Sequence, residues 1–378
     1  MKLLSTLFLF LSFSLCGQAK IDLSNKATIS ILTCGPGQNE LYSLFGHSAF
    51  RVKDEKNNLD KVYNYGTFDF NTPNFYLKFC RGQLLYQVSG YAFKYFPYQY
   101  HNENRWIKAQ VLNLTNEENQ KVYDFLEWNV LEENKNYKYD FFYDNCATKM
   151  HEVLEKSIGK IDFDYSNFPK GLTHRNLIHS YLPKNSWSKF GIDLALGAVI
   201  DEQAKLKEYM FLPDYLAAGV KKGSTHQKNL ITKEKYILPY RQLEKPKTNF
   251  ALSPMFVSII LVIASLYFGF ISKKNNPWFD IISILFGVVG LIIVALWFLT
   301  FHTTTKTNMN LLWANPILLL YPFVSNRWKK HICYIGLGCL GVFVIIAVIG
   351  VQEFDTSFYL LAICLIPLYL KKLLPFKV

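Results

Sequence analysis

The sequence predicts an α+β domain outside the cytoplasm, followed by an all-α transmembrane bundle of about five helices. Three observations lead to this fold class. The first 19 residues have the pattern of a signal peptide. Half of the 378 residues are hydrophobic, and the apolar runs gather at the two ends of the chain. Between those ends, some segments show the alternating apolar pattern of strands, and others show the apolar spacing of amphipathic helices.

The signal peptide is predicted over residues 1–19. Lys2 precedes an apolar core at 3–15, and Gly17-Gln18-Ala19 gives a small-x-small cleavage site. Cys16 suggests a lipoprotein signal instead, but a leucine stands immediately before it, where a small residue is expected. We therefore expect cleavage after Ala19, and divide the remaining chain into an exported Cys/His catalytic domain with a C-terminal helical extension (20–220), a basic linker (221–248) and a transmembrane domain (249–378).

A β-hairpin is predicted early in the exported domain. Residues 46–52 alternate as a strand does, and the charged segment that follows them leads to a second strand at 61–66. His47 begins the first strand, and Asn64 and Tyr65 on the second can lie beside it. Other strands are expected at 27–33, 83–88 and 107–112, and a helix that opens with the capping box at Thr115 is expected to run to about residue 131.

The segment 68–100 is unusually rich in phenylalanine and tyrosine. Two interpretations of these rings stay open. They can be core and strand residues, or they can form an aromatic wall that faces lipid headgroups or an acyl chain.

Cys146 is the candidate nucleophile. Asp144 and Asn145 are good N-cap residues, and the apolar positions after them follow helical spacing up to Gly159. Cys146 is therefore expected in the first turn of a helix, where free N–H groups and the positive end of the helix dipole stabilise a thiolate. His47 is the candidate base for this thiol.

The remaining cysteines and histidines do not indicate a metal site. Seven cysteines are present, none in a CxxC or Cys/His ligand spacing, so no metal or other cofactor is expected. Cys34 and Cys80 lie in the exported part and can form a disulfide or stay free. The other histidines of that part are predicted to be surface or core residues.

A cysteine that heads a helix, packed against a sheet that carries a histidine, is the arrangement of papain-like enzymes. Here the histidine precedes the cysteine, so the chain resembles a permuted NlpC/papain-like fold, as in lecithin:retinol acyltransferase. More closely, it resembles the Lnb-type lipoprotein N-acyltransferases. The motifs that carry this resemblance are Cys34-Gly35-Pro36-Gly37, Leu41 to Val52, Tyr63 to Phe70, Tyr143-Asp144-Asn145-Cys146 and Phe211 to Leu216.

The resemblance implies transfer of a fatty acyl chain from a phospholipid to the N-terminal amine of diacylglyceryl-cysteine lipoproteins. It implies Cys146 as nucleophile and His47 as base, with Asn64 or Tyr65 as the third catalytic residue. Arg51 and Arg105 are candidates for phosphate contact, and Asn145, beside the nucleophile, for substrate contact. The alternatives are an exported Cys/His peptidoglycan peptidase or amidase, and a binding module in which Cys146 is merely buried.

Five membrane spans are predicted, at 252–271, 279–301, 311–324, 331–351 and 357–370. With the exported domain outside, the cytoplasmic loops carry nearly all the lysines and arginines that flank these spans, as the positive-inside rule requires. We therefore expect a multi-pass protein of the inner membrane with its N-terminal domain in the periplasm. These flanking residues also account for much of the net charge of +12, and no nucleic-acid partner is expected.

Overall fold

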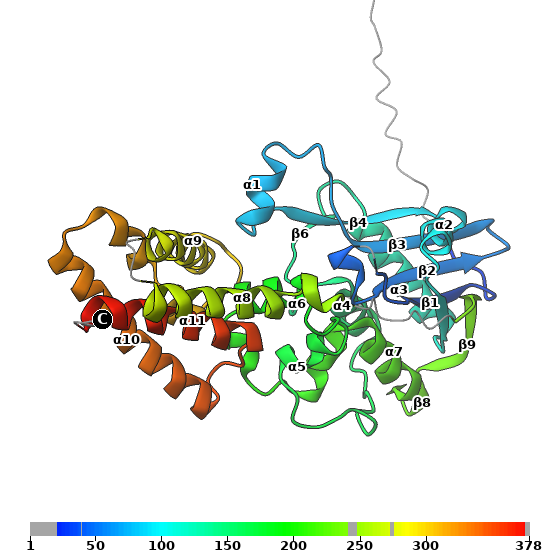
Figure 1. Ribbon diagram of the computed structural model, residues 1–378. Coiled ribbons are helices and arrows are strands. Elements are labelled where there is room, and N and C mark those ends of the chain that lie inside the picture. Colours follow the sequence, from blue (N-terminus) through cyan, green and yellow to red (C-terminus); the bar gives the residue numbers. More distant parts are fainter. Residues whose placement is uncertain (1–20, 39, 241–247, 273–275, 375–378) are drawn as a thin grey trace, which may run out of the picture.

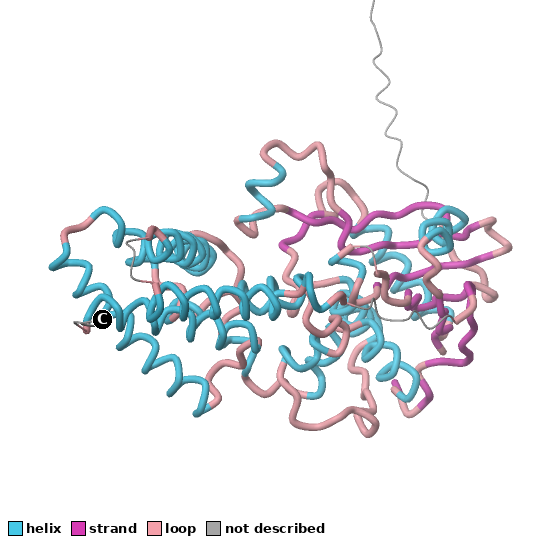
Figure 2. Tube along the Cα trace, in the orientation of Figure 1, coloured by secondary structure: helices cyan, strands magenta, loops and turns pink. Residues whose placement is uncertain are grey.

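The computed structural model describes residues 21–38, 40–240, 248–272 and 276–374. The predicted signal peptide lies outside the described residues. Strands gather in one part of the molecule and long helices in the other (Figures 1 and 2). The first part is the exported domain and the second is the transmembrane domain.

The exported domain is built on a seven-stranded antiparallel sheet with the order β6-β4-β3-β2-β1-β5-β9. Its strands are β1 (Thr28–Cys34), β2 (His47–Asp54), β3 (Leu59–Thr67), β4 (Leu85–Ala92), β5 (Ile107–Leu112), β6 (Asn136–Lys138) and β9 (Ile231–Leu238). A separate pair is formed by β7 (Ser224–Thr225) and β8 (Lys228–Asn229). The predicted hairpin and the strands expected at 27–33 and 107–112 are thus present.

The helices α3 (Asn116–Asn129), α4 (Cys146–Ile158) and α7 (Pro213–Lys222) pack on one face of the sheet. The opposite face is covered by η2 (Phe93–Tyr95) and α2 (Phe96–Asn102). The capping box predicted at Thr115 is present at the start of α3. The shorter helices are η1 (Leu41–Ser43), α1 (Phe75–Cys80), α5 (His174–His179), α6 (Trp187–Ala195), η3 (Ala198–Asp201) and η4 (Leu206–Phe211).

The segment predicted as a linker differs from the expectation. Residues 231–238 form β9, which pairs with β5 at the edge of the sheet. Most side chains of β9 are exposed and three are charged, namely Lys233, Glu234 and Lys235. Charges of this kind protect an edge strand against pairing with other chains, and they also remove the apolar alternation that marks a strand.

In the part of the chain that the structure describes, four helices are long and apolar enough to span a membrane. They are α8 (Pro254–Leu266), extended by the π-helix η6 (Tyr267–Ile271), then α9 (Trp278–Phe298), α10 (Asn326–Ile349) and α11 (Thr356–Leu373); η5 (Phe250–Leu252) precedes them. Basic residues flank the end of the bundle away from the exported domain. There Lys372 donates a hydrogen bond to Asn326 (2.7 Å), and Lys329 lies 3.8 Å from Asp280.

The third predicted span is not a continuous α-helix. It consists of the 3-10 segments η7 (Met309–Leu312) and η8 (Pro316–Phe323), because Pro316 and Pro322 lack the N–H groups that an α-helix needs. The chain still passes from one end of the bundle to the other. Met309 N donates to Gln352 at the exported end, whereas Asn326 lies at the opposite end. This crossing packs closely on α9, since a Cβ at Gly290 would stand 2.0 Å from Ala314 O.

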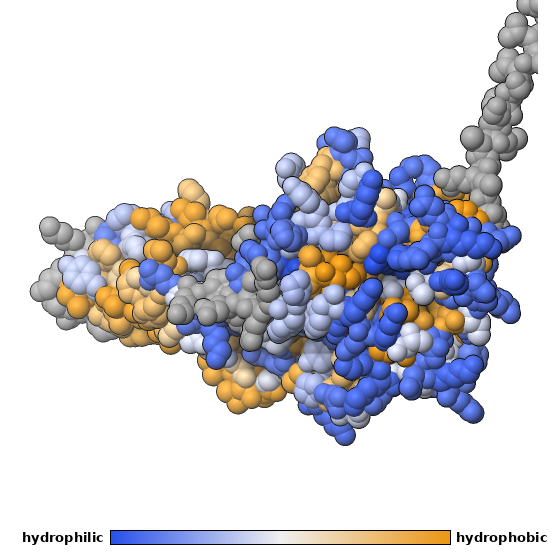
Figure 3. All heavy atoms as spheres, turned by 90° about the vertical axis from the view of Figure 1, so that its right-hand side faces the viewer, coloured by the Kyte–Doolittle hydropathy of each residue, from blue (hydrophilic) through white to orange (hydrophobic). Residues whose placement is uncertain are grey.

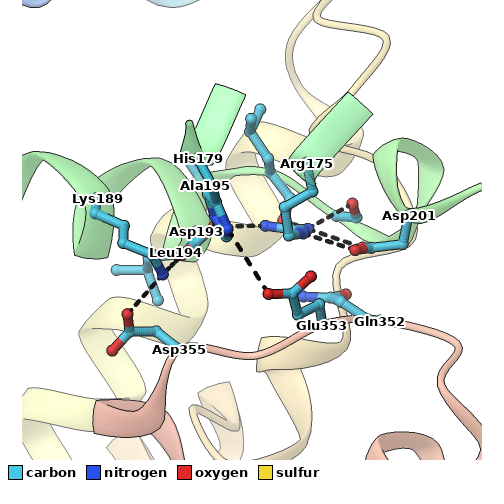
Figure 4. Close-up of polar contacts among 12 residues, drawn as sticks. Arg175, His179, Lys189, Asp193, Leu194, Ala195, Asp201, Gln352, Glu353 and Asp355 are labelled. Carbon is cyan, nitrogen blue, oxygen red and sulfur yellow. Dashed lines mark hydrogen bonds and ion pairs between the residues drawn. The ribbon is translucent and has the colours of Figure 1, made fainter. Parts of the chain in front are cut away.

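A buried ionic cluster joins the two domains, and we call it the junction (Figure 4). Its residues are Arg175, His179, Lys189, Asp193 and Asp201 of the exported domain, with Glu353 and Asp355 from the loop between α10 and α11. Arg175 is 0% exposed and donates to Asp193 (2.8 Å) and Asp201 (2.7 Å). Lys189 reaches across to Asp355 (2.9 Å), so the exported domain is fixed on the ends of the membrane helices.

Candidate active site

His47 is placed by a tight turn into β2. Gly46 has a φ of +79°, a conformation that favours glycine, and a Cβ at this position would lie 2.8 Å from Cys34 O. Cys34 and His47 are paired across β1 and β2. Gly46 therefore lets the chain enter the strand with the imidazole at the end of the sheet.

Asn64 on β3 orients the imidazole. His47 Nε2 lies 2.5 Å from Asn64 Oδ1, and Asn64 Nδ2 donates to the Tyr91 hydroxyl at 3.4 Å. Because an amide oxygen only accepts hydrogen bonds, Nε2 is the donor. The other ring nitrogen, Nδ1, is then the one that can hydrogen-bond the thiol of Cys146.

Cys146 is the first residue of α4, and Asn145 is its N-cap. Asn145 Oδ1 accepts hydrogen bonds from the N–H groups of Ala147 (2.9 Å) and Thr148 (3.0 Å). Its Nδ2 donates to the carbonyl oxygens of Phe141 and Phe211, both at 2.8 Å. The amide of Asn145 is therefore used entirely inside the protein. It positions the nucleophile and has no free group for the substrate contact that the sequence analysis expected.

The electrostatics of the pocket favour an ion pair. Burial opposes ionisation of Cys146, but the charge of His47, its hydrogen bond and the N–H groups of Ser48 and Ala147 together lower the pKa of the thiol. Burial likewise disfavours the imidazolium, yet the charge of Cys146 and the hydrogen bonds to Cys146 and Asn64 raise the pKa of His47. The two groups therefore stabilise each other's charged form, and the pocket favours the thiolate–imidazolium pair more than water does.

Cys34 provides a contrast within the same domain. Burial raises the pKa of its thiol to about 12, and nearby Arg105 offsets this only in part. Cys34 is fully buried, whereas Cys146 is 8% exposed and His47 is half-buried. Cys34 and Cys80, the two cysteines for which a disulfide was left open, are both free thiols.

One backbone donor at the pocket is unused. Among the described residues no acceptor faces the N–H of Cys146, while the next two N–H groups bond to Asn145 and that of Lys149 bonds to the Asn145 carbonyl oxygen. A helix N-terminus with a free N–H beside a nucleophile can stabilise an oxyanion on a carbonyl carbon attached to that nucleophile.

The loop before the nucleophile is organised by Asp140, which the sequence analysis missed. Asp140 Oδ1 accepts the N–H groups of Phe142 (2.9 Å) and Tyr143 (3.2 Å), and the backbones of Asp140 and Asp144 bond to each other. Thr303, in the loop after α9, donates to Asp140 Oδ2 at 2.7 Å. An aspartate whose side chain accepts the N–H of the residue two positions later commonly forms a turn, and such a turn can be predicted from the sequence. The contact between Asp140 and Thr303 joins distant parts of the chain and could not be predicted.

Three other residues predicted for the site, Tyr65, Arg51 and Arg105, have partners outside the pocket. Tyr65, next to Asn64 on β3, points to the opposite face of the sheet and donates to Asn129 (2.6 Å). Arg51 forms a two-point ion pair with Asp60, both bonds at 2.7 Å, and stacks on Phe93.

Arg105 lies nearer the pocket, but it is buried and donates to Gly35 O (2.7 Å) and Glu103 (2.9 Å). Both arginines thus bond to groups of the protein itself, and the phosphate contact that the sequence analysis suggested stays a prediction. Among the described residues, no group of three or more histidine, cysteine, aspartate or glutamate side chains is placed to hold a metal ion.

The geometry defines a class: an α+β domain that presents a paired cysteine and histidine, with an asparagine behind the histidine, on a multi-span membrane domain. The family models agree with both halves. The model of the Lnb N-terminal periplasmic domain matches residues 16–180, and that of the Lnb transmembrane domain matches residues 245–374.

Together these matches cover more than half of the chain, and the protein belongs to the Lnb family. Its N-terminal domain is periplasmic and its C-terminal domain spans the membrane several times, as predicted. No curated protein and no solved structure matches the chain.

Proposed function

We propose that this protein is a lipoprotein N-acyltransferase that works through a thioester on Cys146. The observation that carries the proposal is the pairing of Cys146 with His47 and Asn64 at the head of α4, in a domain fixed on membrane helices. Membership of the Lnb family supports the same reaction, as does the attachment of the domain to membrane-spanning helices.

In the first half-reaction the Cys146 thiolate attacks the ester carbonyl carbon of a phospholipid acyl chain. The carbonyl oxygen becomes an oxyanion, which the N–H of Cys146 stabilises. When the intermediate collapses, the bond to the glycerol oxygen breaks and the His47 imidazolium gives its proton to that oxygen. A lysophospholipid leaves, and the acyl chain stays on sulfur as a thioester.

In the second half-reaction the N-terminal amine of a diacylglyceryl-cysteine lipoprotein attacks the thioester. Neutral His47 takes the proton of the amine, the carbon–sulfur bond breaks, and Cys146 returns as thiolate beside the imidazolium. Asn64 holds the ring through both steps by accepting the hydrogen bond of Nε2. The two substrates thus use one site in turn, and we expect ping-pong kinetics.

The test is transfer between defined substrates. The full-length protein is reconstituted with phosphatidylethanolamine that carries deuterated acyl chains, and a synthetic diacylglyceryl-cysteinyl peptide is added. We expect mass spectrometry to find a deuterated acyl amide on the peptide, absent with Cys146→Ser. A peptide whose amine stays free, together with cleavage of peptidoglycan fragments by the same preparation, would contradict the proposal and favour an exported peptidase or amidase.

A further inference from the structure

The segment 68–86, which we call the aromatic lobe, exposes large apolar side chains outside the transmembrane helices. No residue of its helix α1 (Phe75–Cys80) is buried. Phe70 is 70% exposed and Tyr76 is 79% exposed, and Leu77, Phe79 and Leu85 are exposed as well. Most of the surface of the exported domain that faces the viewer in Figure 3 is hydrophilic. A cluster of exposed aromatic rings on such a surface indicates an interaction site.

The aromatic lobe is tied to the end of a membrane span. Phe301 N donates to Arg81 O at 2.9 Å, and His302 Nε2 donates to Cys80 O at 3.2 Å. Figure 1 shows α1 on the side of the exported domain that lies toward the transmembrane helices, next to α9. The last part of α9 and the residues after it are also apolar and exposed, namely Phe298, Leu299 and Phe301. The exposed face of the aromatic lobe therefore continues the lipid-facing surface of α9.

The polar residues of the aromatic lobe suit a membrane interface. Arg81 is exposed and Lys78 is half-buried, and among the described residues neither forms an ion pair. Cations at the edge of an apolar surface keep their aliphatic stems in the lipid and place their charges among phosphate headgroups. Tyrosine rings favour the same depth.

A line of rings leads from the aromatic lobe to the nucleophile. Phe70 contacts Phe68 (5.0 Å between ring centroids), and Phe68 contacts Tyr86 (5.3 Å). Tyr86 stacks on Tyr139 at 4.3 Å. Tyr139 and Cys146 both lie beside Gly66, since a Cβ at Gly66 would stand 3.7 Å from the Tyr139 ring and 4.0 Å from Cys146 Cβ. These rings offer a continuous apolar surface between exposed Phe70 and the sulfur.

We propose that the aromatic lobe inserts into the outer leaflet of the membrane beside α9 and guides a phospholipid acyl chain along Phe68, Tyr86 and Tyr139 to Cys146. The occupant of this surface is the lipid bilayer, because the surface is continuous with that of a membrane span. The insertion stands on the exposure and position of the aromatic lobe alone. The delivery of an acyl chain rests on the proposed function.

Insertion is tested with spin labels on the full-length protein in liposomes of phosphatidylethanolamine and phosphatidylglycerol. One label is placed on the native, exposed Cys80 in a Cys146→Ser background. A matched control carries Tyr98→Cys with Cys80→Ser and Cys146→Ser; Tyr98 is 72% exposed on α2, which lies far from the membrane helices in Figure 1. A third variant labels Ile292→Cys within α9, with Cys80→Ser and Cys146→Ser, and all three variants carry Cys339→Ser to remove a half-buried free thiol.

We expect the label at residue 80 to be relaxed more by oxygen than by a water-soluble nickel chelate, as at residue 292, and the label at residue 98 to show the reverse. Equal behaviour of residues 80 and 98 would overturn the insertion.

Delivery is tested by Tyr76→Asp with Phe79→Asp, compared with Tyr98→Asp. Placing charges in the leaflet should slow acylation of Cys146 by bilayer phospholipid by about tenfold or more, while reaction with the water-soluble ester p-nitrophenyl butyrate changes by less than about twofold. An unchanged rate with bilayer phospholipid would overturn the delivery. If the wild-type protein forms no acyl-Cys146 at all, the proposed function fails, and the spin-label result still decides the insertion.

Discussion

The pocket around Cys146 and the junction are both buried polar clusters, but they hold their charges differently. In the pocket, burial opposes the charged form of both groups, but their mutual interaction lowers the pKa of the Cys146 thiol and raises the pKa of His47. In the junction, Asp193 bonds to Arg175, His179 and Lys189. Despite its burial, those partners lower the pKa of Asp193 to about 2.

The difference separates a site of chemistry from a structural site. The pocket pairs two groups whose pKa values are shifted toward each other, so that a proton can move between them, and it has an N–H that no described residue uses. The junction pairs each of its buried carboxylates with cations, and the lowered pKa of Asp193 keeps that carboxylate charged at neutral pH. Substitutions in the pocket should therefore change rates and leave stability nearly unchanged, and substitutions in the junction should do the opposite.

The largest effect is expected for Cys146→Ser. A serine hydroxyl is not ionised by His47, so acyl transfer should fall by at least about 10³-fold. Because serine fits the same space, the free energy of unfolding should change by less than about 1 kcal/mol. Rates are measured with the deuterated phospholipid and stability by thermal unfolding in detergent. A variant with substantial activity would remove Cys146 from the mechanism.

Arg175→Met should break the junction. It leaves Asp201 buried without its arginine partner and removes one of the three partners of Asp193, and we expect a loss of about 3–5 kcal/mol in the free energy of unfolding. The matched control is Arg51→Met, whose ion pair with Asp60 is partly exposed and should cost only about 1 kcal/mol. Chemical denaturation of both variants in the same detergent compares them. Equal losses would mean that the junction is not the stronger structural cluster.

Asn64→Ala should act on the rate through His47. Without its acceptor the imidazole loses its orientation. We expect kcat/KM to fall by about tenfold to a hundredfold, which is less than the loss expected if proton transfer by His47 were abolished. Tyr65→Phe is the control on the same strand. It removes a hydroxyl bonded to Asn129 on the other face and should cost about 1 kcal/mol of stability with little change in rate. A similar rate loss in both variants would contradict the role given to Asn64.

The pH dependence of alkylation should sharpen the contrast. In the wild-type protein the lowered pKa of Cys146 keeps the thiolate present below the pH at which a free cysteine, with a pKa of about 8.5, becomes protonated. In His47→Ala the cation is gone and burial remains, so the midpoint for iodoacetamide reaction should move to higher pH. The junction variant Arg175→Met should keep the wild-type midpoint. A midpoint unaffected by His47→Ala would exclude the ion pair.

Much of the pocket could be predicted because its signals are local. A glycine before His47, the cap residues before Cys146 and the strand pattern around Asn64 each fix a short piece of backbone. The order of the strands then brings these pieces together. The same signals predicted most of the sheet and the capping box of α3.

The rest depends on contacts that are distant in the sequence. Whether Arg51 is free depends on Asp60 and Phe93, and the use of Asn145 depends on Phe211. In the predicted C-terminal helical extension, α6 ends at Ala195, and Asn308 and Arg175 bond to the carbonyl oxygens of Leu194 and Gly197 at that end. In each of these examples the outcome depends on a residue that is distant in the sequence, so the local sequence pattern could not predict it.

The aromatic-rich segment 68–100 contains both buried and exposed rings. Phe93, Phe96 and Tyr100 are core residues, whereas the aromatic lobe is exposed beside α9. The core interpretation is therefore confirmed for one part of the segment, and the lipid-facing interpretation stays our proposal for the other. Only the position of the sheet relative to the membrane helices separates them.

The most direct test of the central claim is the search for the covalent intermediate. Wild-type protein is incubated with deuterated phospholipid and no acceptor, then digested at low pH and mapped by mass spectrometry. The account predicts one deuterated acyl group on Cys146, released by neutral hydroxylamine and absent in His47→Ala and Cys146→Ser. A folded wild-type protein that transfers the acyl chain to the lipopeptide without any adduct on Cys146 would contradict it.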